Sequence, residues 1–388
     1  MSIDGFPVID AVVHPYNLSA DNAKGQIGPM VREGFYQLHA HWNPPDVQAP
    51  RAWFQQDQDV ATAMDSFCQE SDVDMVVYHT LRLDSLFHDG LCSRAKAQEL
   101  RAGWPGRSFA YIGLDPTLGV ERALDDLDEQ LVDLPDAIGI KFYPDQVDPY
   151  RTFHMADPEV CFPIYERARE RGLRVIAVHK ALPNGPVPLA PYRIDDVEGA
   201  AMAFPDLSFE IVHAGMAFVD ETAYALARFP NVYANLEVTS ALLYKAPRLF
   251  QEALAMMLFW GGPSKLIWAT GANFSHPQIP LHAFWNLELD ADLIARYQLP
   301  PFDAEMKSLI LGRNWATMAG VDLDARMTAV AGDEWDRTRA RVGRRAPYSV
   351  WAERVGESHA DAMSRQAETE ASVSAAGFRH DAAAEPAP

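Results

Sequence analysis

The chain has 388 residues, 48% of them hydrophobic, and its 54 acidic against 33 basic residues give a net charge of −21. This length and apolar content predict one large folded domain or two ordinary ones, and they exclude a disordered or disulfide-framework chain. The negative charge argues against a protein that binds nucleic acid or an anionic membrane through its overall field.

The cysteines and the apolar segments predict a cytoplasmic protein. Cys68, Cys92 and Cys161 form no CxxC pair, so we expect neither a disulfide framework nor a thiolate zinc site. Asp4 and Asp10 lie in the apolar run at the N-terminus, which is unlike a secretory or transit peptide. The longest apolar stretch, ALAMMLFW, is far shorter than the roughly 20 residues that cross a bilayer.

Short β-branched runs alternate with longer stretches of helical periodicity along most of the chain. The runs are residues 8–14, 73–79, 107–116, 137–144, 173–180, 207–215, 231–239 and 266–274. Strand-then-helix units predict a parallel sheet, and eight of them predict a closed (β/α)8 TIM barrel. An open doubly wound sheet is the alternative, but it normally has a glycine-rich phosphate loop after its first strand, and VIDAVVHPYNLS has none.

The predicted barrel spans residues 1–322 and carries two additional segments. Residues 15–58 form a long insertion after the first strand, on the face where barrel active sites lie, so we expect them to form a lid. Residues 323–366 predict a charged helical extension. Residues 367–388 are rich in Ala, Glu and Pro and predict a flexible tail.

Polar residues end most of the predicted strands, at the end of a barrel where active sites assemble. Because strand side chains alternate, Asp10 is expected to share a face with His14, and Asn235 with Glu237. We therefore predict one pocket that contains Asp10, His14, His79, Lys141, His179, His213, Glu237 and Asn273.

Several of these motifs resemble the amidohydrolase superfamily, within it the amidohydrolase-related group that includes aminocarboxymuconate-semialdehyde decarboxylase and the resorcylate-type decarboxylases. The resemblance rests on VIDAVVH, His179, His213 in IVHAG, GANFSHP and the late helix SLILGRNWATMAGVD. It implies a metal-dependent hydrolase-like barrel up to about residue 322. It also implies a metal site with His14, His179 and His213, a nitrogen set that suits zinc.

Two positions depart from the family pattern. Val12 replaces a strand-1 histidine and cannot bind metal, and Asn273 replaces the strand-8 aspartate and cannot act as a general base. A shifted two-metal site that adds Asp10 and Glu237 is therefore an alternative to the three-histidine site, with iron or manganese as alternatives to zinc. His39-x-His41 has the spacing of a ligand pair but lies in the insertion, where a lid contact is expected.

Further residues are candidates for catalysis and substrate binding. Asn273, Lys141 and His79 are the candidate catalytic residues, and Lys141, Lys180 or Arg82 could hold the anion of a substrate. The leading hypothesis is a metal-dependent enzyme that hydrolyses or decarboxylates a small carboxylate-bearing molecule through a metal-bound water or a polarised substrate.

Two other classes of function remain open. The chain could be a degenerate, mononuclear-metal partner subunit of a two-barrel oxygenase resembling the 2-aminoisobutyric acid hydroxylase type, or itself a dinuclear iron or manganese oxygenase. A metal-free small-molecule-binding barrel is the third hypothesis. A homodimer or a heteromer with a paralogous barrel is expected, with residues 334–355 as the contacting segment.

Overall fold

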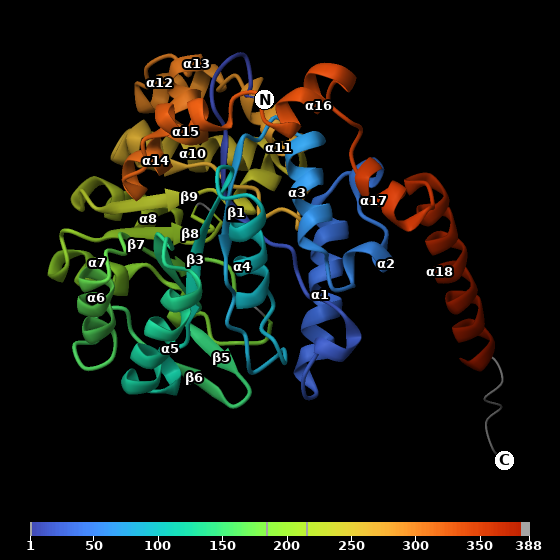
Figure 1. Cartoon of the computed structure of the whole chain (residues 1–388), viewed down its shortest axis with the longest axis horizontal. Coiled ribbons are helices and arrows are strands. Elements are labelled where there is room, and N and C mark those ends of the chain that lie inside the picture. Colours follow the sequence, from blue (N-terminus) through green and yellow to red (C-terminus); the bar gives the residue numbers. More distant parts are fainter. Residues whose placement is uncertain (1, 184, 215, 382–388) are drawn as a thin grey trace.

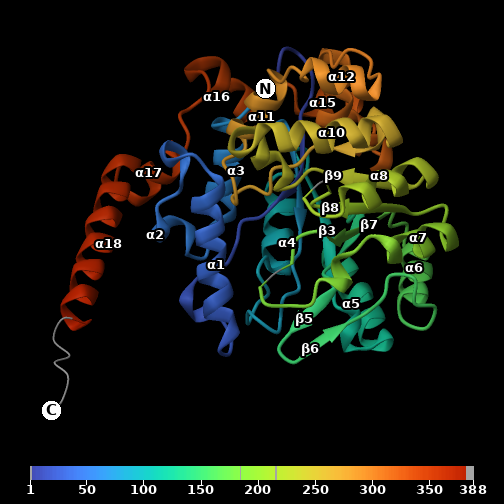
Figure 2. The same ribbon diagram turned by 180° about the vertical axis from the view of Figure 1, so that it is seen from behind.

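The computed structural model describes residues 2–183, 185–214 and 216–381, and its centre is a parallel sheet of eight strands (Figures 1 and 2). In sheet order the strands are β1 (Ile9–Val13), β2 (Met75–His79), β3 (Ser108–Leu114), β4 (Gly139–Phe142), β7 (Val175–His179), β8 (Ser208–Val212), β9 (Val232–Asn235) and β10 (Leu266–Ile267). Backbone hydrogen bonds of 3.1 Å from Ala11 to Trp268 and from Gly271 to Val12 close the sheet. The predicted TIM barrel is confirmed, and each predicted run contains a strand.

Helices cover the outside of the barrel. They include α3 (Val60–Gln69), α4 (Arg94–Gly103), α5 (Val120–Asp133), α6 (Cys161–Glu170), α7 (Asp195–Ala203), α8 (Val219–Arg228), α10 (Pro247–Gly261) and α11 (Gln278–Trp285). In α5 the buried residues Ala123, Leu127 and Gln130 recur at helical spacing and face the sheet. Asp59 begins α3 by accepting a hydrogen bond from the backbone of Thr62. Within the described residues, no helix has the length and apolar character needed to cross a membrane.

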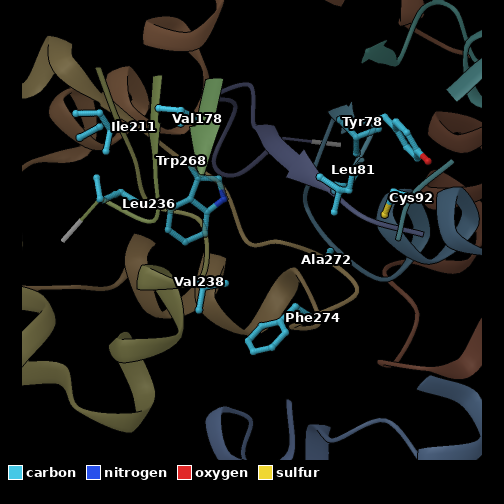
Figure 3. Packing of buried hydrophobic residues seen from close by; sticks show 14 of the residues in the cluster. Tyr78, Leu81, Cys92, Val178, Ile211, Leu236, Val238, Trp268, Ala272 and Phe274 are labelled. Atoms are coloured by element: carbon cyan, nitrogen blue, oxygen red, sulfur yellow. The ribbon is translucent and has the colours of Figure 1, made fainter. Parts of the chain in front are cut away.

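The hydrophobic core has two parts. The larger part lies between the sheet and the helices, and Figure 3 shows some of its side chains, among them Trp268, Leu236 and Val178. The smaller part fills the barrel interior near the start of the strands, where Phe109 packs on Trp315 of α14 (Asn314–Ala319) with ring centroids 4.8 Å apart. This filling leaves the carboxyl ends of the strands as the place for a pocket.

Simple alternation does not hold along β1. Asp10 pairs with Val76, but Val13 pairs with Tyr78, so β1 has one more residue than β2 between these pairs. This is a β-bulge, and Ala11 and Val12 both face the inner core as a result. Alternation therefore cannot predict which β1 side chains reach the pocket.

The insertion of residues 15–58 forms α1 (Ile27–Trp42) and α2 (Arg51–Phe54), which lie beside the barrel (Figure 1). A short hairpin of β5 (Asp145–Val147) and β6 (Tyr150–Thr152) follows β4 and has no counterpart among the predicted elements.

The C-terminal extension consists of α15 (Leu323–Val330), α16 (Glu334–Val342), α17 (Ser349–Val355) and α18 (His359–Asp381). Trp335 and Trp351 are buried, and α16 and α17 contact α3 of the same chain. The far end of α18 extends away from the barrel (Figures 1 and 2). Of the predicted tail, residues 367–381 belong to α18, and residues 382–388 lie outside the described residues.

Candidate active site

A pocket lies at the carboxyl ends of the barrel strands, with polar groups at its base and apolar groups around them. Five predicted site residues line it: His14, Lys141, His179, His213 and Glu237. The other lining residues are Tyr16, Phe35, Leu38, Trp42, Leu81, Tyr143, Leu182, Pro183, Val238 and Phe274. The barrel topology explains the convergence, because the five polar residues come from five separate strands, or from the one or two residues that follow them.

His179 and His213 lie side by side in this pocket. His179 ends β7, His213 follows β8, and the two strands are neighbours in the sheet. Nδ1 of His179 is 2.9 Å from Nε2 of His213. The outer nitrogens have acceptors as partners, since Nε2 of His179 donates to the Leu182 carbonyl at 2.5 Å and Nδ1 of His213 donates to Glu237 Oε2 at 2.8 Å.

These contacts define the tautomers of the two rings. A carbonyl and a carboxylate accept hydrogen bonds, so each outer nitrogen carries a proton. If both rings are neutral, the two inner nitrogens present lone pairs to each other at 2.9 Å. A positive charge between them, either a proton or a metal ion, stabilises this arrangement.

Glu237 is an ionised carboxylate within the pocket. Burial alone would raise its pKa, but His213, His14 and Lys141 together hold the pKa below its usual value. The backbone at Gly271 leaves room for this side chain: a Cβ at Gly271 would lie 2.4 Å from Glu237 Oε1, and Gly271 has a φ of 69°. Both facts favour glycine at this position.

His14 and Lys141 complete the polar part of the pocket. Burial lowers the pKa of His14 to about 3, so its ring is neutral at neutral pH. Nε2 of His14 is 3.8 Å from Glu237 Oε1, and Nδ1 has no hydrogen-bond partner among the described residues. Burial also lowers the pKa of Lys141 to about 8. Its ammonium makes no ion pair within the described part of the chain and lies 5.7 Å from the Tyr143 ring centroid.

Three other predicted site residues do not line the pocket. The Asp10 carboxylate accepts hydrogen bonds from the backbone and hydroxyl of Thr270. His79 stacks on Tyr111, with ring centroids 4.4 Å apart. The amide of Asn273 donates to Gln58 at 2.8 Å. Asp10, His79 and Asn273 are therefore not among the residues that line the pocket.

The remaining candidate cations are already paired. Lys180 is fully buried with Asp196, at 2.8 Å, and Arg82 contacts both Asp84 and Asp126. Of the three cations predicted to hold a substrate's anion, Lys141 is the one that lines the pocket.

The two histidines of the insertion have separate environments. His39 is buried, with its ring bonded to the Phe274 carbonyl and the Ala49 amide at 2.7 Å each, whereas His41 is exposed. His39 thus connects α1 to the loop after β10, as a lid contact would.

Sequence reasoning missed Glu210 in β8. Its carboxyl accepts hydrogen bonds from Asn235 and from Tyr111, the latter at 3.1 Å, and burial raises its pKa to about 7. Asn235 in turn accepts a hydrogen bond from the Glu237 backbone at 2.8 Å. A charged residue inside the apolar run SFEIV was a usable signal.

Two residues that line the pocket have a strained backbone. His213 has a φ of 67° and Val238 a φ of 58°. Side chains seldom adopt such values, least of all β-branched ones, and observed strain of this kind is typical of functional sites.

The ring nitrogens of His179 and His213 meet two requirements of a metal site, but among the described residues a third protein ligand is not grouped with them. Two nitrogens bound to one ion at about 2.0–2.1 Å are about 3 Å apart when the bonds are perpendicular, which agrees with the 2.9 Å between His179 and His213. Metal-binding histidines usually donate their other N–H to a carbonyl or carboxylate, as both rings do here. In residues 2–183, 185–214 and 216–381, however, no three His, Cys, Asp or Glu side chains are grouped so that they could hold a metal ion.

Comparison with known proteins identifies the family to which this barrel belongs. The amidohydrolase family model matches residues 9–318, most of the chain. The chain therefore belongs to the amidohydrolase family. No curated protein matches it.

Two solved structures share the fold. An uncharacterized TIM-barrel protein from Bordetella bronchiseptica is 16% identical, with a TM-score of 0.59 over 81% of this chain and 99% of that one. A 5-carboxyvanillate decarboxylase from Novosphingobium aromaticivorans, a mutant with bound manganese and 3-methoxy-4-hydroxy-5-nitrobenzoic acid, is 11% identical, with a TM-score of 0.51 over 82% and 98% of the two chains. At these identities the likeness concerns the fold alone.

Proposed function

We propose that this chain is a metal-dependent enzyme that hydrolyses or decarboxylates a small carboxylate-bearing molecule. The observation that carries the proposal is the pair of inner nitrogens of His179 and His213, 2.9 Å apart with both outer nitrogens held as donors. Burial, His213 and Lys141 keep the pKa of His179 well below its usual value. Nδ1 of His179 therefore keeps a lone pair at neutral pH, and we infer that a divalent ion binds this lone pair together with that of His213 Nε2.

A bound divalent ion would polarise the substrate or lower the pKa of a bound water to about 7. The chain's own residues would do the rest. Glu237 and the Leu182 carbonyl hold the two imidazoles in the ligating tautomer. Lys141 is the cation free to pair with the substrate's carboxylate, and a charge-assisted bond of this kind is among the strong ones.

The apolar lining indicates the rest of the substrate. Tyr16, Phe35, Trp42, Tyr143 and Phe274 surround the polar base. Such a wall buries an apolar or aromatic body and excludes water, which strengthens the attraction between Lys141 and an anion. We therefore expect a carboxylate on an apolar or aromatic body.

The test is turnover of a panel of aromatic and aliphatic carboxylates and their esters by chelator-treated protein with and without added Zn²⁺ or Mn²⁺. The proposal expects release of CO₂ or a hydrolysis product that requires the metal and that falls at least 100-fold in His213→Ala. Turnover that is equal with and without metal, or binding of carboxylates without any turnover, would contradict it.

A further inference from the structure

A second hollow adjoins the pocket on the outer side of α1. Met30, Val31, Gly34, Phe35, Gln37, Leu38, Pro183, Gly185 and Pro186 line it, and Gln37 is its one polar side chain among these. Phe35, Leu38 and Pro183 also line the candidate active site. We call this hollow the α1 groove; it adjoins the pocket at these three shared residues.

The α1 groove is apolar and open to water. Met30 is 65% exposed and Leu38 is 43% exposed. The facing segment lies close to the helix, because a Cβ at Gly185 would be 3.6 Å from Val31 Cγ2. The groove is thus a slot between α1 and the residues Pro183, Gly185 and Pro186, and no other described residue lines it beyond those named above.

Gly34 keeps this slot open. A glycine inside a helix costs about 1 kcal/mol relative to alanine, and packing does not explain it here, because a Cβ at Gly34 would meet nothing within 4 Å. Gly28 in the same helix differs: its Cβ would lie 2.4 Å from the Leu86 carbonyl oxygen. Packing explains Gly28, whereas Gly34 leaves space on the wall of the groove.

We propose that the substrate is a carboxylate with an extended apolar chain, whose carboxylate pairs with Lys141 and whose far end lies in the α1 groove. This inference rests on the proposed function and narrows its substrate class. The polar base of the pocket binds the carboxylate. Phe35 and Leu38, which line both hollows, contact the middle of the substrate's apolar chain, and Met30 and Val31 contact its far end. Each buried methylene is expected to tighten binding about fourfold.

The experiment measures dissociation constants for straight-chain carboxylates from butanoate to decanoate by calorimetry. The parent protein is compared with Gly34→Leu, which fills the groove, and with Lys141→Met. Gly103→Leu is the matched control, because a Cβ at Gly103, the last residue of α4, also meets nothing within 4 Å. Circular dichroism checks that each variant is folded.

We expect affinity to rise with chain length in the parent and in Gly103→Leu. In Gly34→Leu, butanoate should bind as in the parent, while decanoate loses at least tenfold. Lys141→Met should weaken every member of the series.

Other outcomes separate the two proposals. Two results would contradict binding of the chain end in the α1 groove and leave the proposed function standing. One is an affinity that depends on Lys141 but not on chain length. The other is a Gly34→Leu variant that binds decanoate as tightly as the parent does. Carboxylate binding that is unaffected by Lys141→Met would contradict both proposals, because each assumes a carboxylate substrate that pairs with Lys141. A change of mass in light scattering for Gly34→Leu would show that the groove instead holds a second copy of the chain.

Discussion

The Lys141 ammonium is the residue on which recognition of an anion depends in this account. It lies in the pocket without an ion pair in the described part of the chain. Hydrogen bonds to charged groups contribute about 1.5–3 kcal/mol. Replacing Lys141 by Met should therefore weaken binding of a small carboxylate about tenfold to a hundredfold, as measured by calorimetry, and should leave metal binding intact. An unchanged carboxylate affinity in folded Lys141→Met would disprove the assignment.

Lys141 should also make the affinity for a carboxylate depend on pH. Burial lowers the pKa of Lys141 to about 8, so the ammonium that attracts the carboxylate is present below that pH and is lost above it. Affinity should be constant from pH 6 to 7.5 and then fall about tenfold per pH unit above pH 8. Lys141→Arg should show no such fall, because arginine stays charged throughout this range. Titrations at a series of pH values measure both; a flat profile in the parent would count against a titrating Lys141.

Among elements, α3 and α17 depend on one buried carboxylate. Glu70, after the end of α3, accepts hydrogen bonds from His276 and from the backbones of Tyr348 and Val350 at 3.0, 2.9 and 2.7 Å. Glu70→Gln keeps the shape of the side chain but removes the charge and an acceptor, which should cost about 1–3 kcal/mol. Hydrogen exchange should then rise first in residues 345–355. Equal protection of this segment in variant and parent would show that the contact is not the anchor.

This anchor also has a pH dependence. Burial alone would raise the pKa of Glu70, but its hydrogen bonds and His276 hold the pKa below the usual value. A carboxyl with a lowered folded-state pKa adds stability that is present above its unfolded pKa of about 4.3 and is lost as the pH falls through the folded value. The free energy of unfolding of the parent should thus fall in acid more steeply than that of Glu70→Gln, as measured by urea denaturation.

The elements also show what the sequence could and could not predict. The eight barrel strands were predictable because β-branched runs and helical periodicity are local signals, and their order placed His179 beside His213. The bulge of β1 was not predictable, because it depends on how β1 pairs with β2. The bulge interrupts the alternation of side chains after Asp10. The partners of Asn273, His79 and Lys180 lie in distant segments, so their engagement with Gln58, Tyr111 and Asp196 required the fold.

At the scale of the whole molecule, the question is whether this barrel acts by itself. The segment 334–355, predicted to contact a partner, packs on α3 of its own chain, and the far end of α18 extends away from the barrel (Figure 2). We predict that the chain expressed alone is folded and turns over its substrate. Protein that gains activity only when a homologous barrel is co-expressed would favour the partner-subunit hypothesis instead.

Metal titration of chelator-treated protein tests most directly whether a metal ion binds between His179 and His213, as we propose. Calorimetry with Zn²⁺ and Mn²⁺ should find one ion per chain in the parent and in His41→Ala, whose histidine is exposed outside the pocket. His213→Ala, if folded by circular dichroism, should bind none. No binding by the parent, or equal binding by His213→Ala, would contradict the account.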